Sequence, residues 1–218
     1  MRFRHYIIRL NRYLKTYGIF KTTRHLFEYL KSDIIQNKYI IFFSELTEAA
    51  DELDRLPENI TIEPRKSINE LSSAELERLS SYWIAEIIKD NLTERYKRDN
   101  ATLWLLKYNN EIAAFIWTTT KLLESDRFFP YGQRDIYLFD AGTFPEYRGR
   151  HYQPVLMKHI QKKLKKAGFT RCFIYVRELN GAMLRSISRS GWKKFGTARK
   201  FHLCGYDVVI WSDMANAK

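Results

Sequence analysis

Residues 144–160 read FPEYRGRHYQPVLMKHI, and their types suit the binding of a phosphate group. Gly149 permits a tight turn or a close approach of a ligand to the backbone. Arg148 and Arg150 place positive charge on both sides of it. A helix beginning near Pro154 would aim backbone N–H groups and the positive end of its dipole at the same point. The segment therefore predicts an anion site, and a turn before a helix without any ligand is the alternative.

An acid inside an apolar run is the second feature with possible chemistry. Asp140 stands in IYLFDAG, where burial would raise the pKa of its carboxyl group and suit it to act as a general base. A carboxylate that is hydrogen-bonded at a strand end or bulge is the alternative, and the two are evenly balanced. Asp135 begins the same run, where we expect exposure at a strand edge, and Tyr137 lies between the two acids.

These residues need elements that position them, and the apolar periodicity supplies an order. Asn109-Asn110 is a strong hairpin signal. The expected elements are strands at 59–66, 101–108, 111–121, 134–144, 169–177, 192–201 and 206–212, and helices at 72–91, 154–166 and 182–190, with Ser72 or Ser73 as a cap. This order predicts a mixed α/β sheet with helices on its faces.

The order resembles that of the GNAT superfamily of acyl-CoA-dependent N-acyltransferases, over roughly residues 59–212. Three segments carry the resemblance. NNEIAAFIW (109–117) resembles the second hairpin of the family, FPEYRGRHYQPVL (144–156) its pyrophosphate motif, and NGAMLRSISRSGWKKFG (180–196) its last helix. The resemblance implies a central, mostly antiparallel sheet flanked by helices.

The resemblance also implies that acetyl-CoA or another acyl-CoA is the co-substrate. His151 and Gln153 stand where the family commonly has glycines, and His tolerates positive φ better than most residues. Backbone N–H groups near Ala141 and Gly142 would polarise the thioester carbonyl. The residues expected to hold the coenzyme are Ala141, Gly142, Thr143, Arg148, Gly149, Arg150, His151, Tyr152, Gln153 and Asn180.

Direct attack of an amine on the thioester is the reaction that the resemblance implies. It needs a base for the ammonium group and a proton source for the departing thiolate. The candidate catalytic residues are Asp140, Asp135, Tyr137 and Ser188. The family often carries a tyrosine acid seven residues beyond the asparagine, and that position is Ile187 here, so Ser188, Tyr152 or water would have to take its place.

Residues 1–58 lie outside the resemblance and are expected to form a basic helical appendage followed by an acidic linker, with the GNAT-like domain at 59–218. A β-rich run, KYIIFFSEL, occupies 38–46 within this segment. The basic amphipathic residues 1–40 predict either helices packed with their arginines in solvent or contact with an anionic membrane surface. No nucleic-acid motif is recognisable, so nucleic acid is not expected as a partner.

Composition limits the remaining possibilities. The N-terminal residues lack the apolar core of a signal peptide. Cys172 and Cys204 share no metal-like spacing, so we expect buried thiols in a reducing cytoplasm and no metal site. The net charge of +12 favours anionic partners. We therefore expect a cytoplasmic protein, with peripheral contact at the inner face of the membrane as an extension.

Two functions stay open from the sequence. The first is an N-acyltransferase that moves an acetyl or other acyl group from acyl-CoA to an amine, such as that of an amino sugar or a lipid-linked envelope precursor. The second is a GNAT-fold module without catalysis that binds a CoA ester or a partner. The sequence fixes neither the acceptor, nor the acyl length, nor the oligomeric state.

Overall fold

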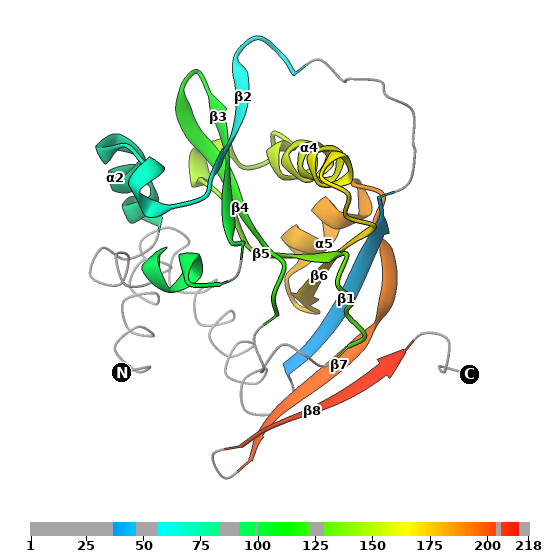
Figure 1. Cartoon of the computed structure of the whole chain (residues 1–218). Coiled ribbons are helices and arrows are strands. Elements are labelled where there is room, and N and C mark those ends of the chain that lie inside the picture. Colours follow the sequence, from blue (N-terminus) through cyan, green and yellow to red (C-terminus); the bar gives the residue numbers. More distant parts are fainter. Residues whose placement is uncertain are drawn as a thin grey trace, which may run out of the picture. The chain divides into compact units, whose positions relative to one another are not determined.

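The computed structural model describes residues 37–46, 56–82, 92–98, 100–122, 129–203 and 206–213 (Figure 1). The chain divides into two compact units, residues 39–198 with 211–218, and residues 1–38 with 199–210. All residues discussed below as a site belong to the first unit.

Eight strands form one mixed sheet in the order β2-β3-β4-β5-β6-β1-β7-β8. The pairs β2–β3, β3–β4, β4–β5 and β1–β6 are antiparallel, and β5–β6 is parallel. The strands are β1 (Asn37–Glu45), β2 (Ile60–Arg65), β3 (Thr102–Tyr108), β4 (Glu111–Thr119), β5 (Asp135–Thr143), β6 (Arg171–Arg177), β7 (Lys193–Leu203) and β8 (Tyr206–Asp213).

The helices follow the expected order along the chain. They are η1 (Ile68–Glu70), α2 (Ser73–Tyr82), η3 (Pro145–Tyr147), α4 (Tyr152–Lys166) and α5 (Gly181–Ser188), with a further helical turn at 92–96. The predicted mixed α/β sheet flanked by helices is therefore confirmed. Among the described helices, none combines the length and apolar character needed to cross a membrane.

Two faces of the sheet carry different helices (Figure 1). On one face, Tyr82 of α2 packs on Phe115, and Tyr96 packs on Trp117, both of β4. On the opposite face, His159 of α4 lies against Trp104 of β3. Since alternate residues of a strand point to opposite faces, α2 and the 92–98 segment share one side of the sheet and α4 covers the other.

The hairpin predicted at Asn109-Asn110 is confirmed. Both asparagines have positive φ, 49° and 65°, which is the backbone that a two-residue type I′ turn requires. The turn joins β3 and β4, whose register runs from Thr102↔Thr118 to Tyr108↔Glu111 with one irregularity after Leu106.

Strand β1 has an unexpected place in the sheet. The β-rich run predicted at 38–46 is a strand, and it pairs with β6 from Tyr39↔Arg177 to Glu45↔Arg171. It thus contributes to the sheet between β6 and β7, although it precedes the region of family resemblance. Residues 1–36 and 47–55 lie outside the described residues, so the expected appendage and linker stay a prediction.

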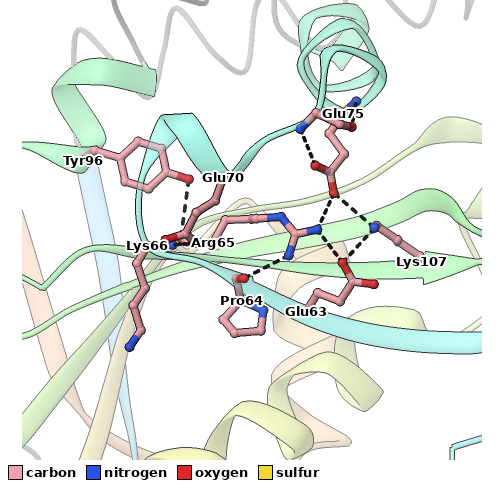
Figure 2. A network of polar contacts seen from close by, with 9 residues as sticks. Glu63, Pro64, Arg65, Lys66, Glu70, Glu75, Tyr96 and Lys107 are labelled. Carbon is pink, nitrogen blue, oxygen red and sulfur yellow. Dashed lines mark hydrogen bonds and ion pairs between the residues drawn. The ribbon is translucent and has the colours of Figure 1, made fainter.

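A polar network fastens α2 to the sheet (Figure 2). Ser72 and Glu75 form a capping box, because the Ser72 N–H donates to Glu75 Oε2 at 2.8 Å and the Glu75 N–H donates to Ser72 Oγ at 3.2 Å. The other oxygen of Glu75 lies 2.7 Å from Arg65 Nη2 and 3.1 Å from Lys107 Nζ. Glu63 shares both cations, at 2.5 and 2.8 Å. One carboxylate therefore starts the helix and ties it to β2 and β3.

Burial opposes the ionisation of Glu75, but the hydrogen bonds from the Ser72 N–H, Arg65 and Lys107 outweigh it and lower the pKa of Glu75 to about 2. The ordinary value is 4.5. A group with a depressed pKa in the folded state stabilises the fold above its unfolded pKa and loses that contribution as the pH falls toward its folded pKa.

We predict that Glu75→Gln lowers the free energy of unfolding by about 1–3 kcal/mol at pH 7. The difference from the wild-type protein should shrink between pH 4.5 and about 2, because the wild-type protein loses the same interaction there by protonation. Urea unfolding across this pH range measures it, with the exposed Glu77→Gln as control. A difference that does not change with pH would contradict the assigned role.

Candidate functional site

An extra residue in β5 creates the centre of the site. Phe115 pairs with Gly142 and Trp117 with Phe139, so one residue of β4 faces two residues of β5, Asp140 and Ala141. This is a β-bulge, and Asp140 has the left-handed φ of 47°. The structure places this acid in a bulge, where the backbone departs from the ladder next to an ionisable side chain, and its role as a general base stays a prediction.

The strand that separates from β5 is β6. The parallel ladder runs from Asp135↔Arg171 to Leu138↔Ile174 and has no pair beyond Leu138, where the bulge begins. If the acyl group were held near Asp140 between the predicted strands 111–121 and 134–144, these two strands would have to splay apart there. That expectation from the sequence is wrong, because β4 and β5 pair on both sides of the bulge. The opening lies one strand further along the sheet.

A cavity of about 640 Å³ occupies this opening. Its lining includes the 94–98 segment and residues at the start of α5 as well as strands β5 and β6. The lining residues are Tyr39, Glu94, Arg95, Arg98, Tyr137, Phe139, Asp140, Ala141, Ile174, Tyr175, Val176, Arg177, Asn180 and Met183.

Asp140 lines this cavity with a guanidinium group beside it. Arg95 donates from Nε to Asp140 Oδ2 at 2.5 Å, and its Nη2 contacts the same oxygen. Both side chains are partly buried, with exposed fractions of 31% for Asp140 and 19% for Arg95. Asp140 Oδ1 makes no hydrogen bond with any residue that the structure describes, so one carboxylate oxygen is fixed and the other is available.

Asp135 has a different environment from the one expected. Instead of being exposed at a strand edge, it is 2% exposed and accepts two hydrogen bonds from Arg171, at 2.9 and 2.7 Å, and one from the Gly132 N–H at 2.6 Å. It does not line the cavity. The pair joins the first residues of β5 and β6 and so closes the end of the ladder opposite to the cavity.

The loop before α4 has the backbone expected of an anion site. Gly149 has φ of 82° with open space beside it, and His151, the N-cap of α4, has φ of 61°. The expected tolerance of positive φ at His151 is confirmed. In the described part of the chain, no acceptor takes a hydrogen bond from the backbone N–H groups of 149–153. These donors, at the positive end of a helix, fit a pyrophosphate.

Gln153 anchors the helix to the bulge. Its buried carboxamide donates from Nε2 to the carbonyl oxygens of Phe115, at 3.1 Å, and Gly142, at 2.5 Å. Gly142 has a packing role, because an added Cβ would lie 2.4 Å from the Phe115 ring and 2.7 Å from Tyr82. Gln153 thus connects the start of α4 to both strands at the bulge, which a glycine at this position could not do.

Ion pairs and rings hold the segment before the loop. Arg78 of α2 pairs with Glu146 and with Glu111, at 3.1 Å, and its guanidinium lies 3.9 Å from the centre of the Phe144 ring. Tyr147 donates to Glu111 at 2.7 Å. Burial, followed by this hydrogen bond, raises the pKa of Tyr147 to about 12. The turn η3 is therefore fixed to α2 and β4 before the loop begins.

The remaining expected residues of the loop are divided between surface and core. Arg148 is exposed and donates to the Thr143 carbonyl oxygen at 3.3 Å, while Arg150 lies 5.6 Å from the ring of Tyr147. Tyr152 is buried against Tyr147 and does not line the cavity. Arg189 Nη1 lies 2.7 Å from His151 Nδ1. Arg189 is therefore a further cation at the loop.

Helix α5 supplies one expected residue to the cavity and not the other. Asn180 is its N-cap, accepting from the Met183 N–H at 3.1 Å, and lines the cavity. Ser188 is exposed, donates to the Arg185 carbonyl oxygen at 2.9 Å and lies outside the lining. Ile187 is buried. Of the four candidate catalytic residues, the structure brings only Asp140 and Tyr137 to the cavity.

Several cavity residues were not singled out from the sequence. Arg95 and Arg98 stand three apart in RYKR, and this clustering of cations is the one signal in the sequence that could have found them. Tyr39, Tyr175 and Arg177 come from β1 and β6, and their proximity follows from strand pairing that the sequence does not reveal.

Comparisons with known proteins give a family. The model described as the acetyltransferase (GNAT) family matches residues 66–192. No curated protein matches the sequence of this chain. Among solved structures, the chain is similar to the glucosamine N-acetyltransferase region of a fungal multi-domain GH3 β-N-acetylglucosaminidase, with a TM-score of 0.52 and 15% identity over 82% of this chain and 22% of that one.

Two bacterial structures are also similar. A GCN5-related N-acetyltransferase from Sphaerobacter thermophilus has a TM-score of 0.49 and 13% identity, over 88% of this chain and 56% of that one. The ribosomal-protein-S18-alanine N-acetyltransferase from Escherichia coli has a TM-score of 0.46 and 18% identity, over 72% of this chain and 97% of that one. The chain spans less than two thirds of the first two structures, and identities this low concern the fold alone.

The backbone of the loop gives a sharp prediction. Gly149→Val should weaken acetyl-CoA binding at least about 10-fold, because a β-branched residue at positive φ costs on the order of 1–3 kcal/mol and moves the N–H donors. No clash contributes, since the space beside Gly149 is open. Isothermal titration calorimetry with acetyl-CoA measures the effect.

Gly168→Val is the matched control. Gly168 has φ of 87°, also with open space, but lies beyond the other end of α4. It should lose similar folding stability and keep its affinity for acetyl-CoA. Equal losses of affinity in both variants, or wild-type affinity in Gly149→Val, would exclude the loop as the binding site.

Proposed function

This chain belongs to the acetyltransferase (GNAT) family, and we propose that it transfers an acetyl or longer acyl group from acyl-CoA to the amine of an amino sugar, either free or part of a lipid-linked envelope precursor. The observation that carries the proposal is the bulge, which presents the Asp140 carboxylate and the Ala141 backbone in a cavity opened by the separation of β5 from β6.

Enzymes of this family use acetyl-CoA as co-substrate. When bound, it supplies the thioester that the amine attacks and the thiol that leaves. The N–H groups of 149–153, with Arg148, Arg150 and Arg189 nearby, would hold its pyrophosphate. Gln153 keeps these donors at a fixed place relative to the bulge, since it is bonded to both β4 and β5.

In this proposal Asp140 receives the proton of the acceptor's ammonium group. Its Oδ2 is held by Arg95, which keeps the carboxylate oriented, while Oδ1 is available to the ammonium. The left-handed backbone at this residue projects its side chain into the cavity from a strand that would otherwise continue its ladder. A base within hydrogen-bond reach of the attacking amine is the main requirement of direct attack.

The Ala141 backbone is the donor proposed for the thioester oxygen. Ala141 has no partner in the β4 register or the β6 register and lines the cavity. A fixed backbone N–H directed at developing negative charge typically contributes about 10²–10³-fold to a rate. Ser188 and Tyr152 lie outside the cavity lining, so of the three proton sources considered for the leaving thiolate the lining favours water.

A surface of aromatic rings supports a sugar as acceptor. Tyr137 stacks with Phe139 and with Tyr175 at centroid distances of 5.9 and 5.3 Å, and all three line the cavity. Such a surface suits the apolar face of a sugar ring, while the tyrosine hydroxyl groups are polar. The glucosamine N-acetyltransferase region named above shares the fold and does not by itself identify the acceptor.

We further propose a cytoplasmic enzyme that contacts the inner face of the membrane through residues 1–40. The support is the basic amphipathic sequence of this segment, which suits an anionic lipid surface. Of these residues only the start of β1 is described, so the membrane contact stays a prediction from the sequence.

Asp140→Asn tests the chemistry. We predict that kcat for glucosamine falls by about 10²–10⁴-fold, because the base is lost, while acetyl-CoA affinity changes less than about 3-fold. Asn adopts left-handed φ readily, so the bulge should persist. Thiol release from acetyl-CoA measures turnover, and Glu77→Gln serves as the control for the loss of a carboxylate elsewhere.

Unchanged kcat in Asp140→Asn would remove Asp140 from the mechanism. Tight acetyl-CoA binding by the wild-type protein without thiol release, for any amine offered, would favour the non-catalytic binding module instead.

A further inference from the structure

Arg98 lines the cavity, and no described residue of the chain offers it an anionic partner. Its guanidinium carbon lies 4.2 Å from the centre of the Phe139 ring. The side chain is partly buried, and its Nη1 is buried without a hydrogen bond. Within the described part of the chain, no carboxylate pairs with it. Burying a cation without a partner is unfavourable unless a ligand supplies the opposite charge.

The other charges of the cavity do not satisfy Arg98. The lining contains three arginines and two acids. Asp140 pairs with Arg95, and Glu94 pairs with Lys97. Both acids are therefore engaged by other cations, and the cavity keeps an excess of positive charge beside Arg98.

Arg98 is placed for the acceptor and not for the coenzyme phosphates. It lies on the face of the sheet that carries α2, over Phe139, whose ring is tilted against that of Trp117 at a centroid distance of 6.0 Å. The loop of 148–153 contributes nothing to the cavity lining and precedes α4 on the other face. The two cationic regions therefore serve different parts of a reaction complex.

We propose that the acceptor carries an anionic group, a phosphate or a carboxylate, in addition to its amine, and that Arg98 binds this group. This inference rests on the proposed acyl transfer, in which the acceptor is the molecule whose amine receives the acyl group. Arg95 lies in the 92–96 helical turn, Arg98 follows two residues after that turn, and both line the cavity with Asp140, so an anion at Arg98 shares the cavity with the Arg95–Asp140 pair. One small molecule can then present its amine to Asp140 and its anion to Arg98, above the aromatic rings.

The test compares four amino sugars that differ in charge: glucosamine, glucosamine 1-phosphate, glucosamine 6-phosphate and muramic acid. The two phosphates and the carboxylate of muramic acid show which anionic group, and at which position on the sugar, is bound. For each compound, kcat/KM with acetyl-CoA is measured by thiol release, and Kd is measured by calorimetry on the CoA-saturated protein. Saturation with CoA fills the phosphate loop, so it cannot account for binding of the sugar anion.

At least one anionic compound should exceed glucosamine by about 10- to 100-fold, the usual effect of a charge-assisted hydrogen bond. Arg98→Met should reduce this ratio to within about 3-fold of unity, and Arg98→Lys should retain part of it, because the charge remains. Lys166→Met, at the C-terminal end of α4 and outside the cavity lining, is the matched loss of one charge and should keep the full ratio.

The ratio of kcat/KM for an anionic compound to kcat/KM for glucosamine is insensitive to partial unfolding of a variant, because unfolding lowers both values equally. The proposal is overturned if glucosamine equals every anionic compound, if no anionic compound binds, or if the preference survives in Arg98→Met. It is also overturned if Arg98→Met weakens acetyl-CoA instead of the sugar anion.

Failure of the proposed function gives a different result. Arg98-dependent binding of an anionic compound without thiol release would refute acyl transfer and support the anion site. Turnover of glucosamine without any anion preference would support acyl transfer and refute the anion site.

Discussion

The bulge at Asp140 is the constraint on which the site depends. One additional residue in β5 interrupts the ladder, so β5 remains paired to β4 on both sides but has no pair with β6 beyond Leu138. The same distortion leaves the Ala141 backbone without a register partner and directs an acid into the resulting cavity. A regular strand at this point would continue its ladder with β6 and leave no space for a thioester.

The surrounding structure holds this distortion in place from three directions. The buried Asp135–Arg171 pair fixes the closed end of β5 and β6, so that the strands separate at one end only. Gln153 connects α4 to the carbonyl oxygens of Phe115 and Gly142 on the two strands at the bulge. The network around Glu75 holds α2 to β2 and β3, and Tyr82 at the end of α2 packs on Phe115 beside Gly142. Left-handed backbone at a non-glycine residue persists where the surroundings determine it this strongly.

Much of the fold could be predicted from the sequence because short stretches of neighbouring residues determine it. The Asn109-Asn110 turn, the capping serine at 72 and the positive φ at His151 are each set by a few neighbouring residues. The cavity is different, since it depends on pairing between distant strands. Nothing near Tyr39 indicates that β1 lies beside β6, and nothing near Asp140 indicates that β6 is the strand that separates. The burial of Asp135 likewise needed Arg171, a partner from another strand.

The central claim is that the opening between β5 and β6 is the place of acyl transfer. A crystal structure of the acetyl-CoA complex tests it most directly. We predict the pyrophosphate at the N–H groups of 149–153, the pantetheine arm between β5 and β6, and the thioester oxygen within hydrogen-bond distance of the Ala141 N–H. A coenzyme bound elsewhere, or a complex in which β5 and β6 are paired past Leu138, would contradict the account.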